Sequence, residues 1–119
     1  MASPHRVNRV REMLLRELSD IVMQLKDPRI RLVTVMDTEV SQDIRYAKMF
    51  VSVIGDEEEQ REAMDALQRA LGFIRREVAR RVPLRYTPEL RVVYDDTAEK
   101  AAHLTALFNH IDKTGDGRT

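Results

Sequence analysis

Apolar residues near the N-terminus recur every three or four positions, which is the spacing of one face of an α-helix. Ser3 can cap the start of this helix, and Pro4 suits the first helical position because that position needs no N–H partner. Asp27 precedes Pro28 and is therefore pushed out of the helical region, which predicts the end of the helix there. The apolar stripe consists of Val7, Val10, Leu14, Leu18, Ile21, Val22 and Leu25.

Two strand-like segments follow the first helix. Residues 32–40 are rich in β-branched side chains, and residues 44–54 alternate between apolar and polar side chains. The polar segment 41–43 is a short link between them, so an antiparallel hairpin is predicted. One face of the second strand carries Ala47, Met49, Val51 and Val53, with Arg45 in the same parity at its start, and the other carries Tyr46, Lys48, Phe50 and Ser52.

A second helical stripe begins near Asp56, which is followed three residues later by Glu59, the spacing of a capping box. Gly72 lies inside this stripe, where glycine is unfavourable, and Pro83 ends the stripe, or Pro88 at the latest. The apolar positions are Ala63, Leu67, Leu71, Ile74, Val78 and Val82.

The last part of the chain predicts a strand at residues 89–94 and a further helix, with Asp96 and Glu99 at capping-box spacing. The order is helix, strand, strand, helix, break, helix, strand, helix. This order predicts an α+β two-layer domain in which helices pack a three-stranded sheet. Residues 1–111 are expected to form this single domain, and residues 112–119 a flexible tail.

Composition narrows the function classes. The chain of 119 residues has no cysteine, so disulfides, thiolate nucleophiles and cysteine-type zinc sites are excluded. No triad-like signature, phosphate-binding loop or dinucleotide fingerprint occurs, and we predict no enzyme, no cofactor and no metal. No apolar run reaches the roughly 18 residues of a membrane-spanning helix, and no secretory signal is visible, which predicts a cytoplasmic protein.

Five stretches, in order, resemble the ribosome-binding factor A family. No one of them is diagnostic alone, and the specificity lies in their order and spacing over residues 5–111. They are Arg6-Val7-Asn8, then Leu32 to Val40, then Ser41-Gln42-Asp43-Ile44-Arg45-Tyr46-Ala47-Lys48 leading into Val51-Ser52-Val53, then Leu67 to Arg75, and finally Pro88-Glu89-Leu90 with Tyr94-Asp95-Asp96.

This resemblance implies a type II KH-like fold and a non-enzymatic factor in ribosome biogenesis. It implies binding to the 30S ribosomal subunit or its precursors during late maturation and processing of 16S rRNA, a link to growth in the cold, and release assisted by a ribosome-assembly GTPase. In the family, a kinked helix–helix junction replaces the Gly-x-x-Gly loop of KH domains. The matching residues here are Ala70-Leu71-Gly72.

Charge is segregated along the chain, although 20 basic and 20 acidic residues give a net charge of zero. Residues 69–91 hold seven arginines and two acids, whereas residues 56–65 hold six acids and one arginine. Arginine matches phosphate oxygens with a planar fork, so the basic stretch indicates RNA binding, although a solvated, salt-bridged helix face has the same pattern. The residues expected to hold rRNA phosphates are Arg6, Arg9, Arg11, Arg45, Lys48, Arg75, Arg76, Arg80, Arg81 and Arg85.

Two further residues each carry two interpretations. In the first interpretation, Gly72 lets a phosphate approach the helix backbone, either at a patch without a side chain or at a kink that exposes free N–H groups. In the second, Gly72 lets the helix pack closely on a strand. Tyr46 either stacks on a base or is an ordinary surface residue. A monomer is expected. The alternative function is a protein-interaction module or homodimer that pairs the acidic and basic faces.

Overall fold

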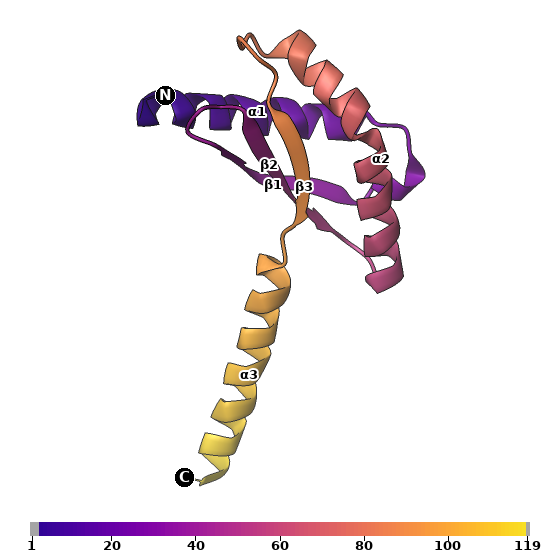
Figure 1. The fold of residues 1–119 in the computed structure, drawn as a ribbon. Helices are drawn as coiled ribbons and strands as arrows, with labels where there is room; N and C mark the ends of the chain where they lie inside the picture. Colours follow the sequence, from indigo (N-terminus) through magenta and orange to yellow (C-terminus); the bar gives the residue numbers. More distant parts are fainter. Residues whose placement is uncertain (1–2, 119) are drawn as a thin grey trace.

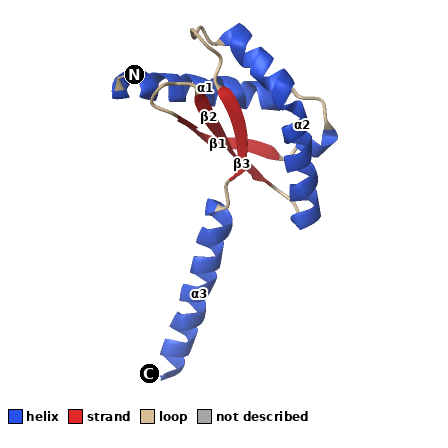
Figure 2. Cartoon of the chain, viewed as in Figure 1, coloured by secondary structure: helices blue, strands red, loops and turns tan. Residues whose placement is uncertain are grey.

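The structure is a computed structural model that describes residues 3–118, with the backbone alone described at residues 98, 108 and 110–118. Helices α1 and α2 cover one face of a three-stranded sheet, and α3 extends away from this body (Figures 1 and 2). The predicted α+β class is therefore confirmed. The elements are α1 (Pro4–Gln24), the short 3-10 helix η1 (Pro28–Ile30), β1 (Val33–Val40), β2 (Tyr46–Val53), α2 (Glu57–Arg81), β3 (Glu89–Tyr94) and α3 (Thr97–Arg118).

The sheet has the order β1-β2-β3, with β1 and β2 antiparallel and β2 and β3 parallel. The predicted hairpin and the predicted alternation in β2 are both confirmed, because all four apolar residues of its inner face are buried. An irregularity in β1 between Val35 and Asp37 shifts the pairing with β2. The shift lets Val33, Val35 and Thr38 all reach the core although their spacing is not strictly alternate.

Helix α1 starts as predicted, since the Ser3 side chain accepts a hydrogen bond from the Arg6 N–H at 3.2 Å. The helix ends at Gln24, however, earlier than the predicted stop at Asp27 and Pro28. Those two residues instead begin η1, where the Asp27 carboxylate accepts from the Arg29 N–H at 2.9 Å. The aspartate thus offers the backbone a local alternative to helix, and the turn buries Ile30.

Helix α2 has the predicted capping box, in which Asp56 and Glu59 each accept a hydrogen bond from the other's backbone N–H, at 2.8 and 3.0 Å. The expected break at residues 70–72 is not a junction between two helices. The chain is helical from Glu57 to Arg81, and Figure 1 shows α2 bending midway. A bend inside one continuous helix keeps its backbone hydrogen bonds, so it frees no N–H groups for an anion.

Gly72 lies on the exposed side of α2. A Cβ atom built there would meet only the Nη1 atom of Arg76, at an ordinary contact distance of 3.6 Å. The interpretation that Gly72 permits close packing on a strand is therefore wrong. Of the two functional geometries, the bare backbone patch beside an arginine remains.

Replacing Gly72 with alanine is expected to stabilise the fold by roughly 1 kcal/mol, because alanine favours the helix and no atom is in the way. Urea denaturation followed by circular dichroism measures this change. A loss of stability would show that the bend in α2 requires glycine. If the stabilised variant also bound its target with unchanged affinity, a backbone approach at Gly72 would be excluded.

Helix α3 is tied to the body near its first turn. Glu99, which was expected to form a capping box with Asp96, instead accepts hydrogen bonds from the Tyr94 hydroxyl and, at 3.1 Å, from Gln60 of α2. The Thr97 N–H donates to the Asp95 side chain at 2.9 Å. The predicted tail at 112–119 falls on backbone-only residues of α3 and on a residue outside the described range, so it stays a prediction.

The contact with Glu99 raises the pKa of Tyr94 to about 12, because the carboxylate accepts a hydrogen bond from the protonated phenol. The stabilising contact is complete below the ordinary tyrosine pKa of 10.0 and is lost as pH rises through about 12. An absorbance titration of tyrosinate should show a late transition that Tyr94→Phe removes and Glu99→Gln shifts to lower pH. A titration curve unchanged by either substitution would contradict this assignment.

Candidate functional site

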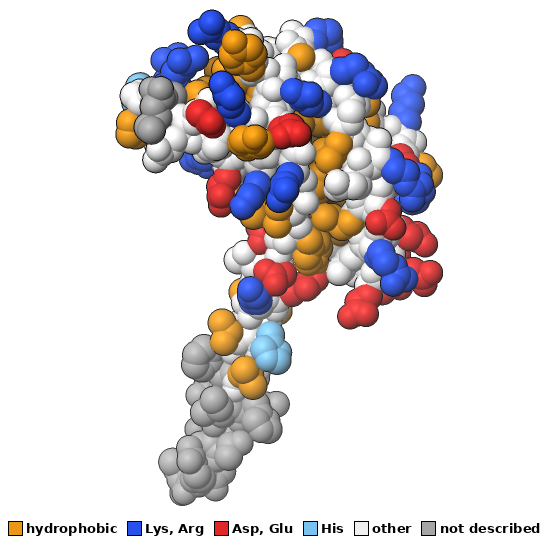
Figure 3. All heavy atoms as spheres, in the orientation of Figure 1, with side chains coloured by type: hydrophobic (Ala, Val, Ile, Leu, Met, Phe, Trp, Pro, Cys, Tyr) orange, Lys and Arg blue, Asp and Glu red, His pale blue; other side chains and the backbone are white. Residues whose placement is uncertain are grey.

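The charge segregation of the sequence is also a segregation in space. In Figure 3, acidic side chains gather around the start of α2, and basic side chains gather at the opposite end of the body, near the start of α1 and the end of α2. The protein is thus electrically polar although its net charge is zero. The basic end is the part suited to a polyanion.

The loop between β1 and β2, at this basic end, is held by its own hydrogen bonds. Ser41 donates from its N–H to the Tyr46 carbonyl at 2.9 Å and from its hydroxyl to Asp43 Oδ1 at 2.7 Å. The Ser41 hydroxyl also accepts from the Tyr46 N–H at 3.0 Å, and Asp43 Oδ1 accepts from the Arg45 N–H at 3.2 Å. The loop therefore presents Arg45 from a fixed backbone.

Ile44 in this loop has a φ angle of 59°, a left-handed conformation that β-branched residues rarely adopt. Its side chain is buried, and its N–H donates to the Ser41 carbonyl at 2.9 Å. Burial and hydrogen bonding thus hold a strained backbone in place. Such strain persists only where the surroundings enforce it, and it is frequent at functional sites.

Beside this loop lies a surface hollow with a volume of about 340 Å³. Three arginines line it, one each from α1, the β1–β2 loop and the α2–β3 loop. We call it the arginine hollow. Its lining residues are Arg6, Asp43, Ile44, Arg45, Leu84, Arg85 and Tyr86.

Arg75 positions the α2–β3 loop, which carries three of these lining residues. Its guanidinium donates to the carbonyls of Thr87 at 2.9 Å and Pro88 at 3.2 Å. The start of β3 is tied to the other loop as well, because the Glu89 N–H donates to the Arg45 carbonyl at 2.8 Å. Both loops that line the arginine hollow are therefore held by hydrogen bonds.

Other predicted phosphate-binding residues have partners within the protein. Arg11 pairs with Asp37 of β1 at 2.9 Å, and Arg80 pairs with Glu77 at 2.8 Å. The second pair raises the pKa of Arg80 and lowers the pKa of Glu77, chiefly through the hydrogen bond between the two side chains. Both pairs leave the arginine partly exposed, so they favour a solvated, salt-bridged face at these two positions.

Arg81 is the least accessible of the paired arginines, with 16% of its side chain exposed. It contacts Asp20 of α1 at 2.5 Å and has Glu77 at 3.7 Å and Glu17 at 3.9 Å. It also donates to Gln24 at 3.1 Å. This cluster joins α2 to α1, so the geometry gives Arg81 a structural position. Arg9 and Arg76 are exposed.

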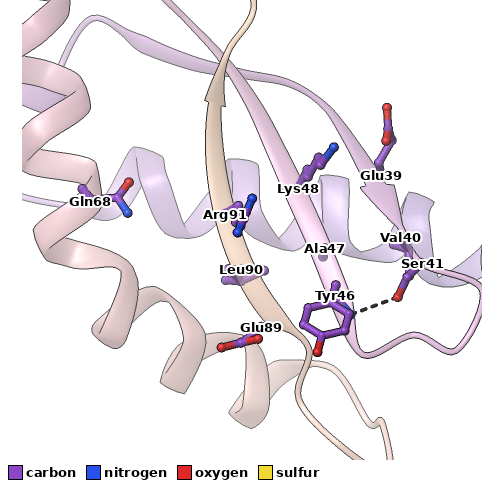
Figure 4. A pocket seen from close by; sticks show the side chains of 10 residues that line it. All are labelled: Glu39, Val40, Ser41, Tyr46, Ala47, Lys48, Gln68, Glu89, Leu90 and Arg91. Carbon is purple, nitrogen blue, oxygen red and sulfur yellow. Dashed lines mark hydrogen bonds between the residues drawn. The ribbon is translucent and has the colours of Figure 1, made fainter.

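The open face of the sheet carries a second, larger hollow of about 600 Å³ (Figure 4). Tyr46 is 58% exposed there, and Lys48 and Arg91 lie on the same face, as the alternation of β2 predicts. Glu39 and Glu89 also line this hollow. This face thus mixes two cations with two carboxylates, which makes it less suited to phosphates than the arginine hollow.

Two other features, a metal site and a membrane-spanning helix, are absent from the residues that the structure describes. Among the side chains that the structure describes, no three histidine or acidic groups are placed to hold a metal ion. In the same part of the chain, no helix is long and apolar enough to cross a membrane.

Among the residues that line the arginine hollow, sequence reasoning missed two with polar side chains, Asp43 and Tyr86. Asp43 lies in a short polar link that was interpreted only as a turn. Tyr86 follows Arg85 in a segment bounded by Pro83 and Pro88. An arginine–tyrosine pair in a loop stiffened by prolines is the signal that could have indicated an exposed aromatic contact.

The fold and the polar charge distribution define a small α+β protein with a braced basic hollow at one end. The chain belongs to the ribosome-binding factor A family, whose model matches residues 6–108. The resemblance inferred from the ordered motifs is thereby confirmed.

Relatives and solved structures agree over most of the chain. Ribosome-binding factor A of Acetivibrio thermocellus is 45% identical over 114 residues, covering 94% of this chain and 93% of the relative. That of Halothermothrix orenii is 46% identical over 107 residues, covering 89% and 88%. The crystal structure of the Thermus thermophilus protein matches with a TM-score of 0.67 at 31% identity, covering 74% of this chain and 93% of that one.

A second Thermus thermophilus match is a homology model fitted into a cryo-electron microscopy map of that protein's complex with the 30S subunit. It has a TM-score of 0.62 at 32% identity, covering 71% of this chain and 90% of the other.

Proposed function

We propose that this protein binds the 30S ribosomal subunit or its precursors through phosphates of 16S rRNA, using the basic end that carries the arginine hollow. Family membership supports the ribosome as target, and the fitted 30S complex of the Thermus relative supports the small subunit. The observation that carries the choice of surface is the convergence of Arg6, Arg45 and Arg85 from three segments.

Charge polarity would orient the protein on RNA. The arginines of the basic end are attracted to phosphates, whereas the carboxylates around the start of α2 are repelled. Direct phosphate contacts are assigned to Arg6, Arg9, Arg45, Arg76 and Arg85, with Lys48 as an outlying contact. Supporting positions, already engaged within the protein, are assigned to Arg11, Arg75, Arg80 and Arg81.

The biological role proposed with this binding is non-catalytic. The protein would act in the cytoplasm as a monomer during late 30S maturation and 16S rRNA processing, with most need in the cold and with release assisted by a GTPase. The KH-like character and the Ala70-Leu71-Gly72 motif belong to the same proposal, with the motif as a bend in α2.

Co-sedimentation of the purified protein with small subunits, large subunits and joined ribosomes tests the proposed target. We expect binding to the small subunit that weakens steeply as salt rises, because phosphate contacts displace counterions. Equal binding to both subunits, or binding indifferent to salt, would contradict the proposal.

The role in maturation predicts a cellular phenotype. Depletion of the protein is expected to accumulate 16S rRNA with unprocessed ends, more strongly at low temperature, as measured by primer extension on total RNA. Normal 16S ends in depleted cells, at both high and low temperature, would contradict the role in maturation but not the binding to the small subunit.

A protein-interaction module or homodimer is the second candidate function, and the opposite charges at the two ends of the body favour it. Sedimentation equilibrium distinguishes the two, because head-to-tail pairing predicts a mass that rises with protein concentration and falls with salt. A constant monomer mass supports the RNA-binding proposal.

A further inference from the structure

We propose that the arginine hollow holds one unpaired guanosine nucleotide of the rRNA, with its phosphate against the arginines, its base against Tyr86, and its hydrogen-bonding edge toward Asp43. This inference rests on the proposed function and adds the kind of RNA that the site recognises. It makes the basic end a reader of a single-stranded base in addition to a phosphate-binding surface.

The dimensions of the site favour a single nucleotide. Its volume of about 340 Å³ lies at the lower end of the range for small-ligand pockets, roughly 300–1,000 Å³. A helical duplex presents only its outer surface to such a depression. An unstacked nucleotide, in contrast, can enter it, which is the usual mode of base-specific RNA recognition.

Tyr86 supplies a surface on which a base can stack. Its side chain is 62% exposed, and the Arg85 guanidinium lies 5.5 Å from the centre of its ring. Aromatic rings and guanidinium planes are the two groups on which proteins stack unpaired bases. Because Arg75 fixes the carbonyls of Thr87 and Pro88, the loop that presents the ring is braced before RNA arrives.

Asp43 makes the hollow different from a simple phosphate site. A carboxylate among three arginines repels phosphate and attracts N–H donors, so a phosphate must lie on the arginine side and a donor group on the other. Hydrogen bonds from the Ser41 hydroxyl and then the Arg45 N–H lower the pKa of Asp43, which keeps it charged near neutral pH. Both bonds end on Oδ1; among the hydrogen bonds of the described residues, none ends on Oδ2.

Guanine matches this arrangement better than the other bases. Its Watson–Crick edge places the N1–H and N2 amino donors side by side, which suits a carboxylate, and its O6 and N7 atoms accept an arginine fork. Adenine and cytosine each offer one amino donor beside an acceptor, and uracil offers one N–H between two carbonyls. The purine also gives Tyr86 more area for stacking than a pyrimidine does.

Fluorescence anisotropy with short uridine-rich RNAs tests the base preference. Each RNA carries one central guanosine, inosine, adenosine or cytidine, and inosine differs from guanosine only in lacking the amino group. We expect guanosine to bind about tenfold more tightly than adenosine, with inosine between them. Equal affinity for all four RNAs, or equal competition by a duplex, would overturn the inference.

Asp43→Asn separates base recognition from loop structure. The amide oxygen can still accept from Ser41 and the Arg45 N–H, while the amide nitrogen replaces the acceptor that would face guanine. We expect an unchanged melting temperature and loss of the guanosine preference. Retention of the full preference in this variant would exclude Asp43 as the reader of the base.

Tyr86→Ala tests stacking, and Tyr46→Ala is its matched control, because both variants remove an exposed tyrosine. Tyr86→Ala should weaken binding of every RNA about tenfold without changing its salt dependence, whereas Tyr46→Ala should have no effect. The reverse result would move stacking to the open sheet face and overturn the proposal. Subunit binding without a base preference would refute this inference alone, whereas absence of 30S co-sedimentation would refute the proposed function.

Discussion

Reversing two charges of the arginine hollow, Arg45→Glu with Arg85→Glu, is expected to weaken binding to the 30S subunit by on the order of 100-fold or more. Each lost charged hydrogen bond costs about 1.5–3 kcal/mol, and the new carboxylates add repulsion from phosphate. The slope of log affinity against log salt should also fall by about two, one for each lost contact. Both side chains are exposed, so the fold should be unaffected.

The matched control for this variant is Lys26→Glu with Arg31→Glu. These residues are also exposed and change the net charge equally, but they lie beyond the other end of α1. We expect a small effect from this control. Equal losses in both double variants would mean that net charge decides binding, and no loss in the first would exclude the arginine hollow as the rRNA contact.

Replacing Arg81 with methionine is expected to destabilise the fold by about 2 kcal/mol while leaving the basic end intact. Methionine keeps much of the apolar stem, but Glu17, Asp20 and Glu77 then lie close together without their shared cation. Breaking a fully buried pair costs about 3–5 kcal/mol, and the partial exposure of the three carboxylates reduces that cost. The melting temperature should fall by roughly 8–16 °C.

Arg80→Met is the control, because Arg80 is the neighbouring residue and is also paired with Glu77, but its side chain is 66% exposed. Its loss should lower the melting temperature much less than the loss of Arg81 does, because water screens an exposed pair. If both variants melted alike, the cluster around Arg81 would not join α1 to α2. A folded Arg81→Met protein that failed to bind 30S would instead show that Arg81 contacts the rRNA.

The sequence predicted the core and the order of the elements because those depend on periodic apolar residues. The stripe of α1 and the alternation in β2 each place a whole face in the core, and the capping box at Asp56 fixes the start of α2. The same logic failed at the end of α1, where the Asp27 side chain accepts a hydrogen bond from the Arg29 N–H and so competes locally with the helix. Such competition is not visible in the periodic spacing of apolar residues along the sequence.

The candidate site was only partly predictable, because an arginine's surroundings are not visible in its position along the chain. Arg81 and Arg85 are four residues apart in one basic stretch, yet one is enclosed by carboxylates of α1 and α2 and the other lines the arginine hollow. Arg75 binds carbonyls that lie 12 and 13 residues further along the chain. Only the packing of helices and loops in three dimensions distinguishes these three positions.

Directed hydroxyl-radical cleavage tests the central claim most directly. The chain has no cysteine, so a single cysteine at Gln42 or at Glu58 tethers an iron chelate to the basic or the acidic end without ambiguity. In complexes with purified 30S subunits, the chelate at Gln42 should cut 16S rRNA strongly at a few neighbouring positions, and the chelate at Glu58 should cut weakly or not at all. Strong cleavage from Glu58 with none from Gln42 would show that the acidic end faces the rRNA. That result would contradict the proposal that the basic end binds it.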